Sequence, residues 1–278
     1  MFDHRQRAFA LVGPGRAGTT LAAAMAARGW RPIAVAGRAP GTASVLRAAE
    51  LLGAPAREVG AAGVDADLVL IATPDAAIAE TAGTIAPGLR SGALVLHLSG
   101  VCTLDELHKL RVMRPDVQVG SLHPLQSLPS VDTGLARLPG SWCAVDGPPE
   151  VERIAVSLGM RPVHIREADR VGYHAAATVA SNHLVALLGQ AARIADAAGV
   201  PLAALLPLVR ATLDNVEELG AEGALTGPVA RGDVDTVSRH LDALPDDERA
   251  AYRALAEQAL RLTGRDDPAL RHALEDHA

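Results

Sequence analysis

The sequence predicts an α/β protein: a doubly wound, mostly parallel β-sheet followed by an all-helical domain with one long helix. Up to about residue 165, short apolar strands alternate with helices, the pattern of a parallel sheet built from strand–helix–strand units. From Glu167 onward, no strand pattern remains and helical runs continue to the end. We therefore expect a sheet domain over residues 1–165 and a helical domain over residues 166–278.

The first half contains apolar runs with the length of buried strands, of which residues 67–73 form the clearest. The expected strands cover residues 9–12, 32–36, 67–73, 93–98, 118–120, 141–146 and 161–165. Helices are expected between them, including residues 19–25, 41–53 and 149–158.

The second half begins with a helix expected from Glu167 to Ala198, which ends at Gly199. At 1.5 Å per residue, this helix would span nearly 50 Å. Such a length leaves apolar faces that need a partner, so we expect a homodimer formed through the helical domain. Pro201 and Pro207 are expected to start new turns. Further helices are expected at 207–219, 234–243, 246–263 and 267–276.

The turn after the first strand reads Gly13-Pro14-Gly15-Arg16-Ala17-Gly18, which fits the G-x-G-x-x-G pattern of a Rossmann dinucleotide site. The first glycine permits the sharp turn, the second lets a pyrophosphate approach the backbone, and the third lets the helix pack closely on the sheet. The phosphate then faces the N-terminus of the helix. We expect this turn to bind the cofactor, together with Thr73 and Pro74 after the strand at 67–73.

Arg38 decides the expected cofactor. In NAD-binding folds, an Asp or Glu about 20 residues past the glycines binds the ribose 2′-hydroxyl. Here Gly37 and Arg38 take that place, and an arginine can bind a 2′-phosphate through two parallel hydrogen bonds. We therefore expect NADP(H) rather than NAD(H). If Arg38 is a solvated surface residue instead, the choice of cofactor is open.

Composition excludes several classes of function. The net charge of −6 and the 2% aromatic content argue against nucleic-acid binding. No apolar run is long enough to predict a membrane span, and the N-terminus lacks the apolar stretch of a signal peptide. The two cysteines, Cys102 and Cys143, form neither a disulfide framework nor a zinc pattern. We expect a cytoplasmic protein without a metal, whose partner is a small-molecule substrate.

Candidate catalytic residues follow the strands, because ligands bind at the carboxyl ends of strands in an open α/β sheet. His123 follows the strand at 118–120, and Pro124 stiffens the backbone after it, so we expect it on a rigid loop as a general acid. Ser99 ends the strand at 93–98, and its hydroxyl either binds a substrate group or serves the turn.

The long helix adds a polar stripe, in which His174, Thr178 and Asn182 follow one another at intervals of four residues. The stripe fits either a substrate site or a packed polar seam. We favour Asn182 as a site residue because a buried amide must find partners. Thr226 and Arg231, in the link before the helix at 234–243, are candidates for binding an anionic substrate. Asp233 is expected to cap that helix.

The chain resembles Rossmann oxidoreductases whose helical domain is like the C-terminal domain of 6-phosphogluconate dehydrogenase. It is most similar to a bacterial family of Rossmann-like proteins with a C-terminal domain of unknown function. The matching segments cover residues 13–18, 97–100, 122–127, 173–183 and 226–233. This resemblance implies a dimeric, nicotinamide-dependent reductase or dehydrogenase. Relatives include pyrroline-carboxylate reductases, ketopantoate reductases and β-hydroxyacid dehydrogenases. The resemblance to ketopantoate reductases suggests a pantothenate-pathway substrate.

One departure limits what the resemblance implies. The better-known relatives place a lysine one helical turn before an asparagine; Asn182 fits the asparagine, but Thr178 stands in the place of the lysine. The proton must then come from another residue, His123 or His174, or the reaction differs. Two hypotheses follow. One is an NADP(H)-dependent oxidoreductase acting on a small carboxylated ketone, alcohol or imine. The other is a nucleotide-binding sensor or scaffold without turnover.

Overall fold

The computed structural model describes residues 7–275. Contacts divide the chain into two compact units, Met1–Ser181 and Asn182–Ala278. The predicted boundary at residue 165 lies before helix α8 (Arg170–Thr178), whereas the division by contacts lies after it. Helix α8 therefore belongs to the unit that contains the sheet, and the two units are described separately.

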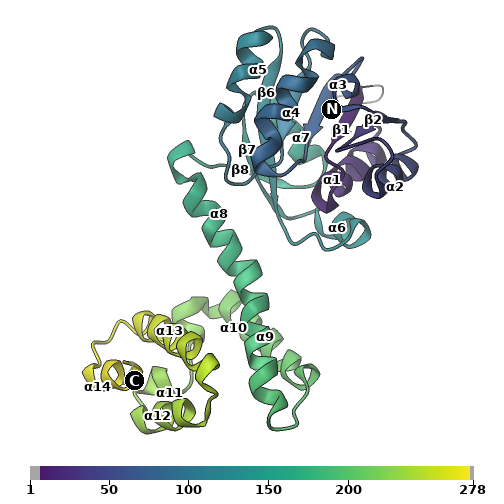
Figure 1. The fold of residues 1–278 in the computed structure, drawn as a ribbon. Coiled ribbons are helices and arrows are strands. Elements are labelled where there is room, and N and C mark those ends of the chain that lie inside the picture. The colour runs from purple at the N-terminus through teal and green to yellow at the C-terminus, as the bar shows by residue number, and fades with distance from the viewer. Residues whose placement is uncertain (1–6, 276–278) are drawn as a thin grey trace. The chain divides into compact units, whose positions relative to one another are not determined.

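Within residues 7–275, the sheet has eight strands in the order β3-β2-β1-β4-β5-β6-β7-β8 (Figure 1). Neighbouring strands pair in parallel, except that β6 and β7 are antiparallel. This arrangement confirms the predicted doubly wound, mostly parallel sheet, whose strand order reverses between β1 and β4. The strands are β1 (Ala8–Val12), β2 (Arg31–Ala36), β3 (Ala56–Arg57), β4 (Leu68–Ile71), β5 (Leu94–His97), β6 (Gln118–Leu125), β7 (Trp142–Asp146) and β8 (Arg161–His164).

Two apolar cores cover the two faces of the sheet. Successive strand residues alternate between them: Leu11 packs into one core and Val12 into the other, as the two-residue period of a strand requires. The first core includes α1 (Arg16–Ala27), α2 (Ala43–Leu52) and α7 (Pro149–Ser157). The second includes α3 (Val59–Ala62), α4 (Ile78–Ile85) and α5 (His108–Met113). Helix α6 (Val131–Arg137) contacts α1. Short 3₁₀ turns occupy η1 (Asp75–Ala77), η2 (Ala86–Gly88), η3 (Leu104–Leu107) and η4 (Glu167–Asp169).

The structure corrects the expected setting of His123, which lies inside β6 and not on a loop. Strand β5 ends at His97, opposite Ser121, whereas β7 stays paired with β6 as far as Leu125. Pro124 therefore lies where β6 is paired with a strand on one edge only, and proline is tolerated at such a place. The proline that suggested a loop thus marks the point where β5 leaves the strand.

The expected long helix is present, but its middle is not α-helical. Helix α8 is followed by a π-helical segment, η5 (Val179–His183), and then by α9 (Leu184–Asp196). Gly199 has a φ of 71°, in agreement with the predicted stop. Helix α10 (Leu202–Ala224) begins before Pro207, which corrects the expected start there. A proline this near the beginning of a helix interrupts it less than one at its centre, because most of the hydrogen-bond ladder follows it.

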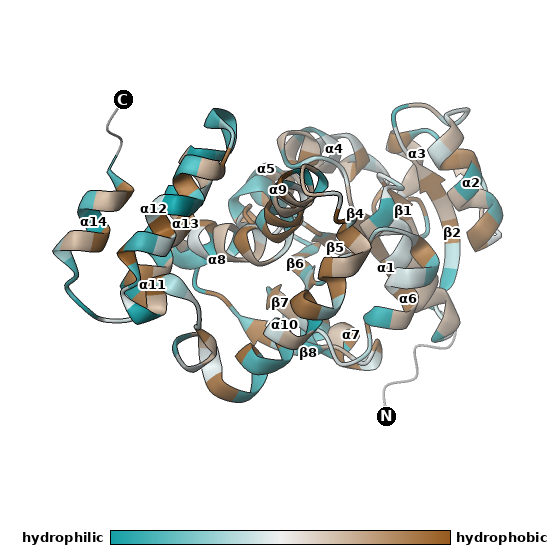
Figure 2. Cartoon of the chain, turned by 90° about the horizontal axis from the view of Figure 1, so that it is seen from below, coloured by the Kyte–Doolittle hydropathy of each residue, from teal (hydrophilic) through white to brown (hydrophobic). Residues whose placement is uncertain are grey.

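The remaining helices are α11 (Pro228–Arg231), α12 (Val234–Ala243), α13 (Asp246–Leu262) and α14 (Pro268–Leu274). They surround a small core that includes Val237 and Leu270. As predicted, Asp233 caps α12, because its carboxylate accepts a hydrogen bond of 3.0 Å from the Thr236 N–H. Hydrophobic residues are also spread along α9 and α10 (Figure 2). Among the described helices, none is long and apolar enough to cross a membrane.

Candidate cofactor and substrate site

The turn between β1 and α1 can be built only with its glycines. Gly13 has a φ of 89°, and a Cβ on it would lie 2.6 Å from the backbone carbon of Ala72. A Cβ on Gly18 would lie 2.5 Å from the Cβ of Ala72, so a side chain there would push α1 away from the sheet. A Cβ on Gly15, by contrast, would meet no atom within 4 Å. The first and third glycines thus shape the turn, while the second faces open space.

The start of α1 offers hydrogen-bond donors that no protein side chain takes. Gly15 is the N-cap residue and supplies no side-chain cap, and the first turn contains no acidic residue. Backbone N–H groups of a first turn have no partner within the helix, and the helix dipole favours negative charge there. This glycine turn therefore has the features of a phosphate cradle.

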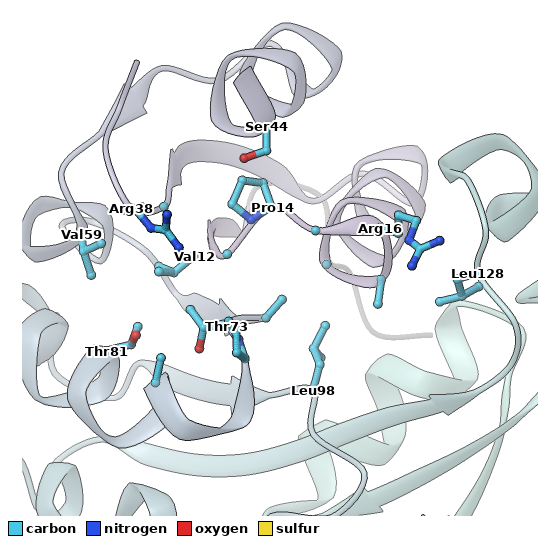
Figure 3. A pocket seen from close by; sticks show the side chains of 18 of the residues that line it. Val12, Pro14, Arg16, Arg38, Ser44, Val59, Thr73, Thr81, Leu98 and Leu128 are labelled. Carbon is cyan, nitrogen blue, oxygen red and sulfur yellow. The ribbon is translucent and has the colours of Figure 1, made fainter. Parts of the chain in front are cut away.

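A cavity of about 1200 Å³ extends from this turn, over the point between β1 and β4 where the strand order reverses. Figure 3 shows it with Arg38, Val59 and Thr81 at one side and Arg16 and Leu128 at the other. All nine residues predicted to contact the cofactor line this cavity: Gly13, Pro14, Gly15, Arg16, Ala17, Gly18, Arg38, Thr73 and Pro74. Thr73 also has a buried Oγ1 without a hydrogen-bond partner among the described residues, as expected for an atom that meets a ligand.

Two further hydroxyl side chains join Arg38 on this cavity wall, and the sequence prediction missed both. Thr42 is the N-cap residue of α2, and Ser44 lies in the first turn of that helix. The helix has no acidic residue in its first turn. An arginine, two hydroxyls and a helix N-terminus together suit a phosphate group. In the sequence, the signal for this phosphate site is the threonine and the serine at the start of the helix expected at 41–53. Glu80 also lines the cavity, but from α4.

At another part of the cavity wall, His123 meets two residues of α8. Its Nδ1 lies 2.9 Å from the hydroxyl oxygen of Tyr173, with the rings edge to face. The ring centroid of His174 lies 6.1 Å away. Burial, together with the nearby His174 and Arg170, lowers the pKa of His123 to about 4, so the imidazole is neutral at pH 7. The sequence prediction missed Tyr173, whose only signal was its position next to His174.

Ser99 lies in the turn after β5, beside this cluster. It is buried, and its Oγ accepts hydrogen bonds from the backbone N–H groups of Val101 and Cys102, at 3.2 and 3.0 Å. Ser99 therefore stabilises the turn, which is one of the two roles expected for it. A substrate contact through the remaining hydroxyl proton stays a prediction.

Thr178 and Asn182 do not form the expected stripe with His174. The Thr178 hydroxyl donates to the backbone oxygen of His174, at 3.0 Å. Beyond Thr178, the π-helical segment Val179–His183 changes the angle between successive residues, which breaks the four-residue interval before Asn182. Asn182 is exposed within the chain, and its role as a site residue stays a prediction. The pattern of the sequence carries no signal for a π-helical turn.

Thr226 and Arg231 belong to the second unit. Thr226 is exposed, and the Arg231 guanidinium lies 3.9 Å from the carboxylate of Asp233. Their role in substrate binding stays a prediction. Within residues 7–275, no group of three or more His, Cys, Asp or Glu side chains could hold a metal ion.

The strand order and the glycine turn define a Rossmann-type α/β domain followed by a helical region. Residues 3–121 match the family of Rossmann-like domains. Residues 142–259 match a family described as a domain of unknown function, DUF2520. The chain therefore combines a Rossmann-like domain with a domain of the DUF2520 family, in agreement with the resemblance inferred from its motifs.

Several solved structures are similar to the chain. A Bacteroides fragilis protein described as a candidate NADP oxidoreductase is 25% identical, with a TM-score of 0.78 over 95% of this chain and 100% of that one. A Thermotoga maritima protein is 23% identical, with a TM-score of 0.65 over 96% and 98% of the two chains. The reductive aminase of Aspergillus terreus, solved with NADPH and ethyl-5-oxohexanoate, is 17% identical. Its TM-score is 0.63, over 97% of this chain and 99% of that one. No curated protein sequence matches the chain.

Proposed function

We propose that the protein is an oxidoreductase that uses NADP(H) to reduce a small carboxylated ketone or imine. One observation carries this proposal: a single cavity reaches from the glycine cradle and Arg38 to His123. The similar Bacteroides protein described as an NADP oxidoreductase supports it, as does the NADPH bound to the similar reductive aminase.

In this proposal, the backbone of the glycine turn binds the pyrophosphate, and Arg38, Thr42 and Ser44 bind the 2′-phosphate. Bound NADPH supplies the hydride. His123 lies at the cavity wall where it can contact the reacting group of the substrate. Arg231 is the proposed partner of a substrate carboxylate, and Ser99, His174, Thr178, Asn182 and Thr226 remain proposed site residues.

The test has two stages. Nicotinamide fluorescence is first titrated with the protein, using NADPH and NADH in parallel. A panel of 2-keto acids, with ketopantoate first, and cyclic imines is then screened for NADPH oxidation. We expect tighter binding of NADPH than of NADH, followed by turnover of at least one compound. Failure to bind either nucleotide would end the proposal.

The second candidate function is a nucleotide-binding sensor or scaffold without turnover. Thr178 favours it, because a threonine replaces the lysine of the better-known relatives. The variants His123→Ala and Asn182→Ala separate the two candidates. Under the enzyme proposal, they abolish turnover and leave NADPH affinity nearly unchanged. Tight NADPH binding without turnover across the panel favours the sensor.

We also propose that the chain forms a homodimer through its helical unit. Helix α10 has 23 residues, and none is buried within the chain. Large apolar side chains on α9 and α10 are exposed, among them Val185 at 70% and Leu208 at 67%. Exposed apolar helix faces are typical of protein–protein interfaces, and the partner proposed here is a second copy of this chain.

A further inference from the structure

The cavity wall near His123 differs from the phosphate-binding end, because a buried cation and a hydrogen-bond donor lie together there. We propose that this part of the cavity is built to accept a developing negative charge, so that the reacting group of the substrate is an uncharged carbonyl and not a protonated imine. The inference rests on the proposed function and names its substrate class.

Arg170 is a buried cation whose hydrogen bonds go to neutral acceptors and whose ion pair with Asp146 is long. The residue is 2% exposed. Its guanidinium donates to the backbone oxygen of Cys102 and to Oγ of Ser121, both at 2.5 Å. The carboxylate paired with it, Asp146, lies 3.9 Å away on a side chain that is 40% exposed. Neutral acceptors thus take its hydrogen bonds, and its positive field persists in surroundings of low dielectric constant.

Arg170 also affects the pKa values of two neighbouring imidazoles, those of His97 and His123. Burial is the main cause that lowers the pKa of His97 and of His123 to about 4, and Arg170 contributes to both. His174 contributes for His123, whereas the carboxylate of Asp75 acts in the opposite direction on both residues. An imidazolium is itself a cation placed at this point, and the surroundings disfavour it. Burial disfavours a charge of either sign at this point, whereas the positive field of Arg170 favours an oxyanion over a protonated imine held against His123.

Tyr173 fixes which nitrogen of His123 faces a ligand. Burial raises the pKa of the Tyr173 hydroxyl to about 12, so the phenol keeps its proton at neutral pH. The hydroxyl oxygen lies 2.9 Å from Nδ1 of His123, so the phenol can donate this proton to Nδ1. A neutral imidazole that accepts at Nδ1 carries its proton on Nε2. An Nε2–H donor suits a carbonyl oxygen, but it opposes the N–H of a protonated imine.

Gly100 lets the rings of His123 and His174 pack against the backbone of the turn after β5. A Cβ at position 100 would lie 2.8 Å from Nε2 and Cε1 of His123, and 2.8 Å from Cδ2 of His174. Only a residue without a side chain keeps both rings in place.

The chemistry balances without a charged acid in the protein. Bound NADPH supplies a hydride that forms the new C–H bond at the carbonyl carbon, while the C=O π electrons move to the oxygen. The Nε2–H of His123 stabilises the charge on that oxygen through a hydrogen bond, in the manner of an oxyanion hole. The oxygen then takes its proton from water, which yields an alcohol and a hydroxide ion that the buffer neutralises. A neutral histidine therefore suffices, although no lysine stands at position 178.

The first test measures the tautomer and titration of His123 by NMR on ¹⁵N-histidine-labelled protein, with His123→Gln to assign its signals. We expect the Nε2–H tautomer and a titration below pH 5. Tyr173→Phe should mix the tautomers. Arg170→Met should move the titration towards pH 6.5, whereas Arg170→Lys should keep it low. If the Met variant does not fold, the wild type and Tyr173→Phe still decide. An Nδ1–H tautomer, or a titration near pH 6.5 in the wild type, overturns the inference.

A matched control comes from the second unit, where His240 Nδ1 lies 2.7 Å from the hydroxyl of Tyr252. Tyr252→Phe should change the signals of His240 and leave those of His123 unchanged. Because these measurements need no nucleotide, a failure of the inference can be told apart from a failure of NADPH binding, and so of the proposed function.

The second test compares two probes of opposite charge on protein saturated with NADP⁺. Acetate and pyrrolidinium are added at equal ionic strength, and the His123 signals are followed. We expect acetate to shift them saturably and pyrrolidinium to leave them in place. Arg170→Met should weaken the response to acetate at least about tenfold. No response to acetate, or a larger response to pyrrolidinium, overturns the inference.

Discussion

Gly100 and His123 lie so close together that a Cβ at position 100 would stand 2.8 Å from Nε2 of the imidazole. Gly100→Ala should therefore displace the ring and lower turnover, by about 100-fold for a shift of about 1 Å. NADPH affinity, measured by fluorescence, should change less than about twofold. Gly83 of α4 is a matched control, since a Cβ there meets no atom within 4 Å. An unchanged turnover in Gly100→Ala would show that the ring position is unimportant.

Arg38 is predicted to select NADPH over NADH. Arg38→Ala removes charge-assisted hydrogen bonds that are worth about 1.5–3 kcal/mol, so NADPH should bind about 10–100-fold more weakly. NADH carries no 2′-phosphate, and its affinity should stay the same. The measurement is a pair of fluorescence titrations, with Arg28→Ala, at the far end of α1, as the control. Equal losses for both nucleotides would contradict a contact with the 2′-phosphate.

The sequence predicted the cavity lining at the glycine turn better than the surroundings of His123, for a physical reason. A glycine turn is local: Gly13, Gly15 and Gly18 are fixed by one strand, one turn and one helix, so their spacing alone predicts the geometry. The His123 cluster joins β6 to α8, and its hydrogen bond links residues 50 positions apart. Neither Tyr173 nor Arg170 carries a local signal, because each acquires its role only through packing.

The predicted fold class was correct, whereas some local features were not, among them the following two. Pro124 suggested a loop because a proline usually interrupts strand pairing, but β5 ends before it. The π-helical turn around Asn182 followed from no residue type in the sequence. Both errors concern backbone geometry that depends on neighbouring elements and not on the segment itself.

His97 should make the protein less stable in acid. It is fully buried, and its pKa is lowered from 6.5 to about 4. Between these two pH values, His97 binds a proton in the unfolded chain but not in the folded protein. The free energy of unfolding should therefore fall as the pH drops from about 6.5 towards 4. His97→Asn retains an acceptor for the Ser99 N–H, which now donates to Nδ1. In urea unfolding at pH 7 and pH 5, the variant should lose about 2 kcal/mol less between the two conditions. An identical loss in both proteins would contradict a neutral His97.

The exposed apolar residues of α10 provide the test of the proposed homodimer. Leu208 and Leu219 are 67% and 56% exposed within the chain and lie eleven residues apart, about three helical turns. Leu208→Glu places a charge on this face and should convert the dimer to a monomer in sedimentation velocity experiments, because burying an unpaired carboxylate costs several kcal/mol. Val156→Glu on α7, at a side chain that is also 56% exposed, should leave the mass unchanged. A monomeric wild type, or a dimer that survives Leu208→Glu at micromolar concentration, would place the interface elsewhere.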